Sequence, residues 1–600
     1  MNRKIWIGAV IVALCLGCVA CTGENLPQTG ENPGTQATLP DISDLFSQRD
    51  YDDGFSDAVT ITLSDSGISA ESSSVAVEGS TVAITAAGTY RITGKLTEGQ
   101  LQIRAGEQDK VHLILDGASV SCSGSAALYI LSGDKVFVTL AEGTENALAS
   151  AGEFTATDEN AVDGAVFSKS DLTFNGTGSL AVLSETGHGI VCKDELRFTN
   201  GTYTVSAALQ GITGKDCISI ADGSFTVVSG TDGLHSKHDE DASRGNITIL
   251  AGSFDITAGN DGMDATGNVV ITGGTFRLFT GEGSDSVTHS DGDWGGMGGM
   301  GGWWGSSSDT ETNTESRKGI KAGAALQISG GSLTIDAEDD ALHSNDSVTV
   351  SGGSFTVASG DDAFHGDNAL TISGGEIHIT KSYEGLEGTY ITVSGGNIRL
   401  VAFDDGMNAA GGNDGSGMAG PWGQGGFGEA TDAWIVISGG ELVLNAGGDG
   451  IDSNGDLTVS GGTVFLDGPE NAGNGALDYA GEGKITGGVF LALGARGMDM
   501  NFGNNSTQCA LLCSLNGTAS AGTELTFKDA SGKVLVRYTS QKTFSSILVS
   551  TPDMAQGQTY TVTVGEATGE FTLDAIINGT GSGMGGGPGG GGPGGRPGRK

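Results

Sequence analysis

Acidic residues recur at fixed positions of a short pattern in this chain, and together they would make a ladder of metal ligands. The pattern reads DDALHSN from Asp339, DDAFHGD from Asp361 and DDGMNAA from Asp404. Calcium takes oxygen ligands at 2.3–2.6 Å, so oxygens on opposite sides of one ion lie about 5 Å apart, close to the spacing of neighbouring β-strands. The sequence therefore predicts calcium at some of the candidate ligands, which are Asp232, Asp261, Asp264, Asp339, Asp340, Asp361, Asp362, Asp404, Asp405, Asp449 and Asp452.

Two other interpretations of these positions stay open. Asp and Asn make turns in any solenoid, so the carboxylates could serve turn geometry alone. Histidines occur at related positions, at His235, His343 and His365, but zinc is disfavoured there because these repeats offer no cysteine partners. A hard cation held by oxygen is therefore the leading prediction, and calcium suits an exported protein.

Lysines form a second series on an otherwise acidic chain. Their ammonium groups could meet the carboxylates of a uronic-acid polymer, or could pair locally with neighbouring acidic residues. The carbohydrate-binding candidates are Lys193, Lys215, Lys237, His343, His365, Tyr383 and Glu384.

Motifs of common enzyme classes are missing from the sequence. It contains no G-x-S-x-G motif, no zincin motif and no phosphate-binding loop. We therefore expect a protein that is not an enzyme and binds no nucleotide. Four tryptophans in Gly/Met-rich insertions could stack on sugar rings or fold over the repeats, and they are Trp294, Trp303, Trp304 and Trp422.

The candidate ligands return at a nearly constant period, which indicates the elements that must hold them. The small residue of the pattern falls at Ala341, Ala363, Gly385 and Gly406, spaced by 22, 22 and 21 residues. Each unit contains about three short β runs, and the signature of leucine-rich repeats is absent. The chain is therefore predicted to be an all-β parallel β-helix of about 22 residues per coil, with an internal column of Leu342, Phe364, Leu386 and Met407.

The period covers only part of the chain, which divides it into segments. We expect a lipoprotein signal peptide at 1–21, a flexible tether at 22–50, a β-rich N-terminal cap at 51–160 and the parallel β-helix at 161–504. Insertions rich in Gly, Met and Trp interrupt the repeats at 281–316 and 411–432. A small C-terminal β-domain at 505–578 and a disordered Gly/Pro tail at 579–600 complete the chain.

Charge and the first residues indicate partners and location. The net charge is −44, from 73 acidic and 29 basic residues, which excludes the basic face that nucleic-acid binding needs. A positive start followed by a short apolar stretch is typical of an export signal, and Cys21, or Cys18, is the expected lipidation site. We therefore expect a protein lipid-anchored to the outer face of the bacterial cell membrane, with no other membrane contact.

Several longer motifs recur in register, among them ISGGSLTIDAEDDALHSN, ITKSYEGLEG and FSKSDLTFNGTGSL. Over about residues 50–575 the chain resembles the bacterial carbohydrate-binding parallel β-helix family of exported cell-surface proteins. The resemblance implies a right-handed β-helix that contains calcium and binds pectin-type polygalacturonate or cellulose without lyase activity.

Two rival functions remain. The implied fold is similar to that of family 9 pectate lyases, so one rival is a calcium-dependent lyase acting by β-elimination, with Lys381 or Lys237 as its base. The other is a structural or adhesive surface protein without a sugar ligand.

Overall fold

The computed structural model describes residues 42, 45–155, 159–289, 315–410 and 431–579, and these contain no α-helix. None of their helical turns is long and apolar enough to span a bilayer. The expected signal peptide with Cys18 and Cys21, the tryptophans at 294, 303, 304 and 422, and residues 580–600 lie outside the described residues.

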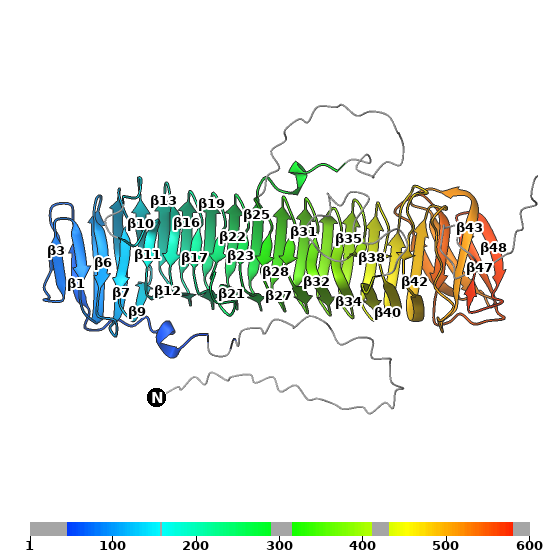
Figure 1. Cartoon of the computed structure of the whole chain (residues 1–600), viewed down its shortest axis with the longest axis horizontal. Helices are drawn as coiled ribbons and strands as arrows, with labels where there is room; N and C mark the ends of the chain where they lie inside the picture. Colours follow the sequence, from blue (N-terminus) through cyan, green and yellow to red (C-terminus); the bar gives the residue numbers. More distant parts are fainter. Residues whose placement is uncertain (1–41, 43–44, 156–158, 290–314, 411–430, 580–600) are drawn as a thin grey trace, which may run out of the picture. The chain divides into compact units, whose positions relative to one another are not determined.

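A mostly parallel sheet of 45 strands makes up most of the described chain (Figure 1). From β10 to β42, each strand pairs in parallel with an equivalent strand about one repeat later, so these strands fall into three columns. We call one strand from each column, with its connecting turns, a rung. Side chains at equivalent positions of successive rungs therefore stack.

The first column lies next to the acidic positions of the pattern. It consists of β11 (Gly164–Ser168), β14 (His188–Cys192), β17 (Ile212–Gly214), β20 (Leu234–Ser236), β23 (Met263–Ala265), β26 (Ile320–Ala322), β29 (Leu342–Ser344), β32 (Phe364–Ile372), β34 (Leu386–Val393), β36 (Met407–Ala409), β39 (Asp452–Ser453) and β41 (Asp478–Tyr479).

The second and third columns complete each rung. The second consists of β12 (Asp171–Gly176), β15 (Glu195–Phe198), β18 (Cys217–Ile220), β21 (Asn246–Ile249), β24 (Val269–Ile271), β27 (Ala325–Ile328), β30 (Ser347–Val350), the second halves of β32 and β34, β37 (Trp434–Ile437), β40 (Asp456–Asp467) and β42 (Gly483–Gly494). The third consists of β10 (Glu145–Ser150), β13 (Ser179–Ser184), β16 (Thr202–Ala207), β19 (Ser224–Ser229), β22 (Ser253–Ala258), β25 (Thr275–Thr280), β28 (Ser332–Ala337), β31 (Ser354–Ser359), β33 (Glu376–Lys381), β35 (Asn397–Ala402), β38 (Glu441–Ala446) and the second halves of β40 and β42.

The repeated Ser-Gly-Gly turn joins the second column to the third, and close stacking explains its glycines. In Ser351-Gly352-Gly353, the second glycine has φ 99°, a left-handed conformation that other residues adopt at a cost. A Cβ on Gly352 would lie 2.6 Å from the carbonyl oxygen of Ser329 in the preceding rung. The spacing between rungs therefore leaves no room for side chains at this turn.

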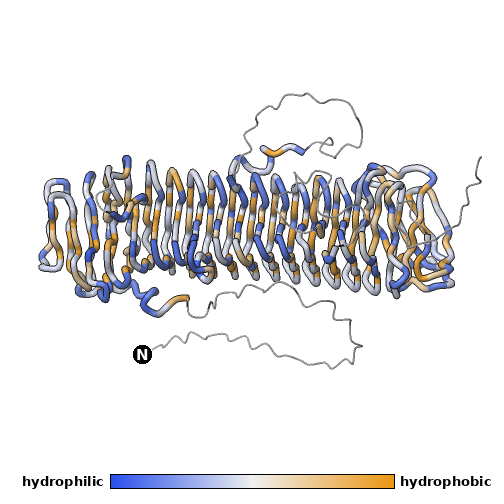
Figure 2. The backbone as a smooth tube through the Cα atoms, viewed as in Figure 1, coloured by the Kyte–Doolittle hydropathy of each residue, from blue (hydrophilic) through white to orange (hydrophobic). Residues whose placement is uncertain are grey.

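Alternation within strands places apolar side chains inside the rungs. Hydrophobic residues, orange in Figure 2, recur from rung to rung. The predicted column is confirmed, because Leu342, Phe364, Leu386 and Met407 pair in register and are all 0% exposed. Aromatic rings form a second stack, in which the ring of Phe254 lies 4.9 Å from Phe225 and 4.7 Å from Phe276 between centroids.

Removing the middle ring of this stack should destabilise the protein strongly. Phe254→Ala is expected to lower the free energy of unfolding by about 3–5 kcal/mol, because it leaves a cavity between two tightly packed rungs. Urea unfolding followed by circular dichroism measures the change. Thr257→Ala, on the exposed face of the same strand, is the matched control and should change stability by less than about 0.5 kcal/mol. Equal losses in the two variants would contradict the assignment of the ring stack to the core.

The parallel pairing begins well before the boundary predicted at 161. β5 (Gly88–Leu96) pairs in parallel with β7 (Lys110–Cys122), which pairs with both β9 (Lys135–Leu140) and β10. β6 (Gln100–Arg104) pairs with β8 (Leu128–Ser132), and β8 pairs with β11. Antiparallel pairs join β1 (Val59–Leu63) to β2 (Ser69–Ala70) and β3 (Val75–Glu78) to β4 (Thr81–Ile84). Residues 59–150 therefore belong to the same sheet, and irregular loop lengths hid their period.

The end of the expected tether is also folded onto the sheet. The short 3-10 turn η2 (Gln48–Tyr51) carries Asp50, which is 1% exposed. Its Oδ1 lies 2.7 Å from Lys135 Nζ and accepts a hydrogen bond of 2.8 Å from Thr173 Oγ1. Burial would raise the pKa of Asp50, but hydrogen bonds from Lys135, Ser47 and Thr173 outweigh it and lower the pKa to about 2. The flexible segment predicted to run to residue 50 therefore ends earlier.

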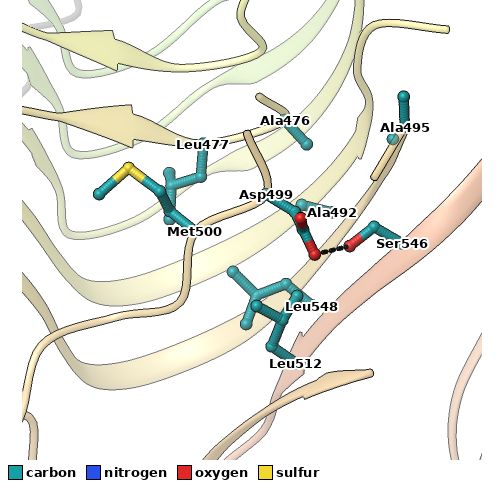
Figure 3. A pocket seen from close by; sticks show the side chains of 10 residues that line it. Ala476, Leu477, Ala492, Ala495, Asp499, Met500, Leu512, Ser546 and Leu548 are labelled. Carbon is teal, nitrogen blue, oxygen red and sulfur yellow. Dashed lines mark hydrogen bonds between the residues drawn. The ribbon is translucent and has the colours of Figure 1, made fainter. Parts of the chain in front are cut away.

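At the C-terminal end the sheet becomes antiparallel. β46 (Phe544–Ser550) pairs with β42 and with β43 (Ala510–Ala519), while β49 (Ile577–Asn578) pairs with β43. β44 (Glu524–Asp529), β45 (Val534–Thr539), β47 (Thr559–Val564) and β48 (Ala567–Thr572) form a separate four-stranded sheet. Within the large sheet, where β42 meets the antiparallel strands β43 and β46, Ser546 Oγ donates to Asp499 Oδ2 over 3.1 Å beside a cavity of about 10 Å³ (Figure 3).

Candidate functional site

The acidic positions lie in the turn that leads from each third-column strand to the next first-column strand. The second acidic residue of this turn accepts a hydrogen bond, through Oδ1, from the backbone N–H of the equivalent residue one rung later. The bond measures 3.3 Å in Asp232, 3.0 Å in Asp340, 3.2 Å in Asp362 and 2.6 Å in Asp405. Turn chemistry therefore accounts for one oxygen of each carboxylate and leaves the second for another partner.

The first-column residues two positions beyond the small residue form the predicted ladder. Their strands pair in register along the whole series, which reads His235, Asp264, Lys321, His343, His365, Glu387, Asn408, Asp452 and Asp478. Of this series, the sequence analysis named His235, Asp264, His343, His365 and Asp452, and it missed Lys321 and Asp478.

A second lysine at the same rung was also missed. Lys318 precedes Gly319, so it occupies a position that holds an aspartate in the next rung. Its ammonium group lies 3.0 Å from Asp339 Oδ1 and 2.8 Å from Asp340 Oδ2, and the residue is 2% exposed. Comparing the Gly319 repeat with its neighbours, position by position, would have found both lysines.

Protein side chains therefore supply positive charge in the middle of the ladder. Oxygens of Asp339, Asp340 and Asp361 lie within 4.8 Å of one another. Burial would raise the pKa of Asp340, but Lys318 and the nearby histidines outweigh it and lower the pKa. Burial, and then the neighbouring carboxylates, raises the pKa of Asp361 to about 9. A metal ion at this group would compete with a buried lysine.

At the first rung of the ladder, a histidine lies close to two carboxylates and offsets their charge. His235 Nδ1 lies 3.0 Å from Asp232 Oδ2 and 3.2 Å from Asp264 Oδ2. Burial would lower the pKa of His235, but these two carboxylates outweigh it and raise the pKa to about 9. The next acidic turn residue, Asp261, accepts a hydrogen bond of 2.7 Å from the N–H of Lys318 and lies 3.8 Å from Lys321 Nζ. Calcium is less favoured here than the sequence predicted, because protonated side chains provide the charge.

One group of carboxylates has no basic partner among the described residues. Oxygens of Asp405, Asp449 and Asp452 lie within 4.8 Å of one another, and no basic side chain in the described part of the chain forms an ion pair with them. Burial, and then neighbouring carboxylates, raises all three pKa values, to about 8 for Asp449 and about 7 for Asp452. A Cβ on Gly448 would collide with the carboxylates of Asp404 and Asp405, so only glycine fits there. We call this group, an all-oxygen set that fits calcium, the carboxylate cluster.

A groove lies beside the carboxylate cluster, where β33, β35 and β38 end. Its volume is about 910 Å³, and its lining includes Lys381, Phe403, Asn445, Gly447 and Lys542. Phe403 immediately precedes Asp404 and Asp405, and Gly447 lies two residues before Asp449, so the groove and the carboxylate cluster share the same turns.

The rings of Phe403 and His289 line the groove, and Tyr383 lies behind them. Phe403 is 37% exposed, and its ring centroid lies 6.1 Å from that of Tyr383 and 5.2 Å from that of His289. Burial, and then the Asp404 carboxylate, raises the pKa of Tyr383. Lys381 Nζ lies 3.4 Å from Asp285 Oδ1 and donates hydrogen bonds to backbone carbonyl groups within residues 284–289. These contacts hold residues 284–289 against the groove. A partly exposed ring beside polar side chains suits a sugar ring, whose faces are apolar and whose edges are polar.

The other predicted carbohydrate contacts lie elsewhere. His343, His365 and Glu384 are 2%, 1% and 6% exposed, so they cannot touch a polymer in this structure. Lys193 Nζ lies 3.9 Å from Asp163 Oδ2, and Lys237 Nζ lies 3.4 Å from Asp239 Oδ1. These two lysines therefore pair locally, which was the alternative interpretation.

Lys215 and Lys237 follow β17 and β20, whereas the groove lies several rungs away at β33, β35 and β38. Of the two candidate bases, Lys381 therefore lies in the groove and Lys237 does not.

Comparison with known proteins identifies the class. The family described as "Carbohydrate-binding domain-containing protein" matches residues 78–363 and 361–501, which include all the carboxylates of the ladder. The chain belongs to this family. Carbohydrate binding is thereby supported as the function of these rungs.

The chain is similar to a relative from Acetivibrio thermocellus and to a solved structure. A carbohydrate-binding domain-containing protein of Acetivibrio thermocellus is 34% identical over 128 residues, which are 21% of this chain and 45% of the relative. The match therefore spans less than half of that relative's length. The solved structure of the polysaccharide lyase-like protein from C. thermocellum, a gadolinium derivative, has 27% identity and a TM-score of 0.34, covering 37% of this chain and 88% of that one.

Proposed function

We propose that this protein is a non-catalytic, calcium-dependent carbohydrate-binding protein that holds an acidic plant cell-wall polysaccharide, such as polygalacturonate, in the groove. The observation that carries the proposal is the position of this groove, with the exposed ring of Phe403, at the same turns as a carboxylate cluster that has no basic partner among the described residues. Asp405, Asp449 and Asp452 would hold the calcium ion.

We also infer that the three columns form a right-handed parallel β-helix. Parallel pairing of each strand with its equivalent one rung later supports this inference, as do the apolar interior and the Ser-Gly-Gly turns between columns. The proposed location is the cell surface, with a lipid anchor at Cys21 or Cys18.

Charge explains why a metal ion would be needed. A chain with net charge −44 repels a polyuronate, so direct attraction between the two cannot drive binding. Bound calcium would link the protein carboxylates to those of the polymer. Lys381 and Lys542 line the groove and would pair with further uronate groups, while Phe403 would stack on a sugar face. A neutral polymer such as cellulose would use the ring alone, and its binding would not depend on calcium.

Loss of the exposed ring should weaken binding without changing the fold. Phe403→Ala is expected to lower the affinity for polygalacturonate about tenfold, equivalent to about 1.4 kcal/mol. Isothermal titration calorimetry with calcium present measures the change. Val228→Ala removes an apolar side chain that is 50% exposed on β19, outside the groove, and should leave the affinity unchanged. If Phe403→Ala binds as tightly as Val228→Ala, the groove is not the binding site.

A mixture of protein, calcium and polygalacturonate also tests whether the protein is a catalyst. Polygalacturonate mixed with the protein and calcium should show no increase in the ultraviolet absorbance of unsaturated uronates. A sustained increase that Lys381→Ala abolishes would replace the proposed binder with a lyase.

A further inference from the structure

His365 is buried among carboxylates that it does not hydrogen-bond. It is 1% exposed, and its Nδ1 lies 3.2 Å from Asp362 Oδ2 and 3.2 Å from Glu387 Oε2. On the other side of the ring, Nε2 lies 3.4 Å from Asp367 Oδ1. None of these five atoms has a hydrogen-bond partner in the described part of the chain. Buried polar atoms without partners are costly, so this arrangement needs an explanation.

The distances around Nδ1 are those between neighbouring ligands of one metal ion. Bonds of 2.0–2.2 Å to a first-row divalent ion place adjacent ligand atoms about 3.0–3.5 Å apart. We propose that Asp362, His365 and Glu387 form a binding site for a divalent transition-metal ion such as zinc. Imidazole nitrogen favours such an ion, whereas calcium prefers oxygen ligands. This site therefore differs in chemistry from the carboxylate cluster and does not depend on the proposed function.

Surrounding groups hold the three ligands in place. His365 and Glu387 are paired in register on β32 and β34, and Asp362 Oδ1 accepts a hydrogen bond of 3.2 Å from the N–H of Glu384. With the metal on Nδ1, the Nε2–H of His365 points to Asp367, as the second nitrogen of metal-bound histidines commonly does toward a carboxylate. The sequence analysis disfavoured zinc for want of cysteine, but the two carboxylates take that role.

In the same ladder, both ring nitrogens of the adjacent histidine have hydrogen-bond partners. His343 Nδ1 lies 2.9 Å from Asp340 Oδ2, and its Nε2 lies 3.0 Å from Asn345 Oδ1. Asp340 also pairs with Lys318 and lies 3.8 Å from His365 Nδ1. Lys318 and His343 therefore already pair with Asp340, whereas the atoms around His365 have no hydrogen-bond partner among the described residues.

Charge argues against a proton alone at this position. One imidazolium would face the carboxylates of Asp362, Glu387 and Asp367, with Glu384 behind Asp362. A divalent ion with a neutral imidazole offsets two negative charges and uses the orphaned atoms as ligands.

Metal analysis of the whole protein tests the proposal. The site is closed, so the protein is produced in zinc-supplemented medium, dialysed in millimolar calcium and analysed for zinc. We expect one retained equivalent per chain, lost in His365→Gln and kept in Asp405→Asn, which alters the carboxylate cluster. Asp367→Asn should lower the zinc affinity about 10- to 100-fold. No retained zinc in the wild type, or equal zinc in wild type and His365→Gln, would overturn the proposal.

A second measurement avoids reliance on a folded variant. Anomalous diffraction at the zinc edge from crystals of the wild-type protein should give a peak bonded to His365 Nδ1, Asp362 and Glu387. A peak at the carboxylate cluster instead, or none at His365, would overturn the proposal.

Discussion

Asp449→Asn is expected to abolish calcium-dependent binding of polygalacturonate. The substitution removes one charged ligand from the carboxylate cluster, and the affinity of calcium sites depends strongly on the number of charged ligands. We expect the calcium affinity to fall about 100-fold, equivalent to about 2.7 kcal/mol, and polymer binding to be lost at submillimolar calcium. Calorimetry with calcium, and then with polymer, measures both effects.

The control for this experiment is an acidic residue outside the ladder. Asp222 is exposed and hydrogen-bonds only its own turn, at the N–H of Gly223, among the contacts described. Asp222→Asn should bind calcium and polymer as the wild type does. Unchanged binding in Asp449→Asn would place the calcium site, or the polymer, elsewhere.

Calcium-free protein is expected to lose stability as the pH rises from about 4 to about 8. The pKa of Asp449 is about 8 and that of Asp452 about 7 in the folded state, against an ordinary value of 3.8. Between these values the folded state keeps protons that the unfolded state releases, so the free energy of unfolding falls with increasing pH. Because neighbouring carboxylates titrate as a group, we expect a loss of about 2–4 kcal/mol in total.

Denaturant unfolding at pH 5 and pH 8, with a calcium chelator and with excess calcium, measures this dependence. Calcium binds the deprotonated carboxylates, so its stabilising effect should be larger at pH 8. His235, with a pKa of about 9, contributes a loss of the same sign between about pH 6.5 and 9, so Asp449→Asn is needed to separate the two. That variant should lose part of the pH dependence below pH 6.5. Greater stability of the calcium-free wild type at pH 8 than at pH 5 would contradict the raised pKa values.

Periodicity made much of the fold predictable. The all-β class, the internal column from Leu342 to Met407 and the register of the ladder follow from one spacing, because stacked strands bring every equivalent residue together. The same reasoning failed for residues 59–150, where loops of variable length conceal equivalent strand pairing. The pattern of recurring acidic residues also did not reveal Lys318 and Lys321, because this one rung carries lysines at positions where other rungs carry acidic residues.

By itself, the sequence determined which residues share a column, since that depends only on spacing along the chain. The tertiary structure alone decided which carboxylates pair with a protein cation, as Asp340 does with Lys318, and which have none in the part of the chain that the structure describes, as in Asp405, Asp449 and Asp452. It also decided that Lys381, Phe403 and Lys542 meet in one groove. The physical reason is that charge pairing and burial depend on distances between side chains of different rungs and insertions, and turn packing sets those distances to within an ångström.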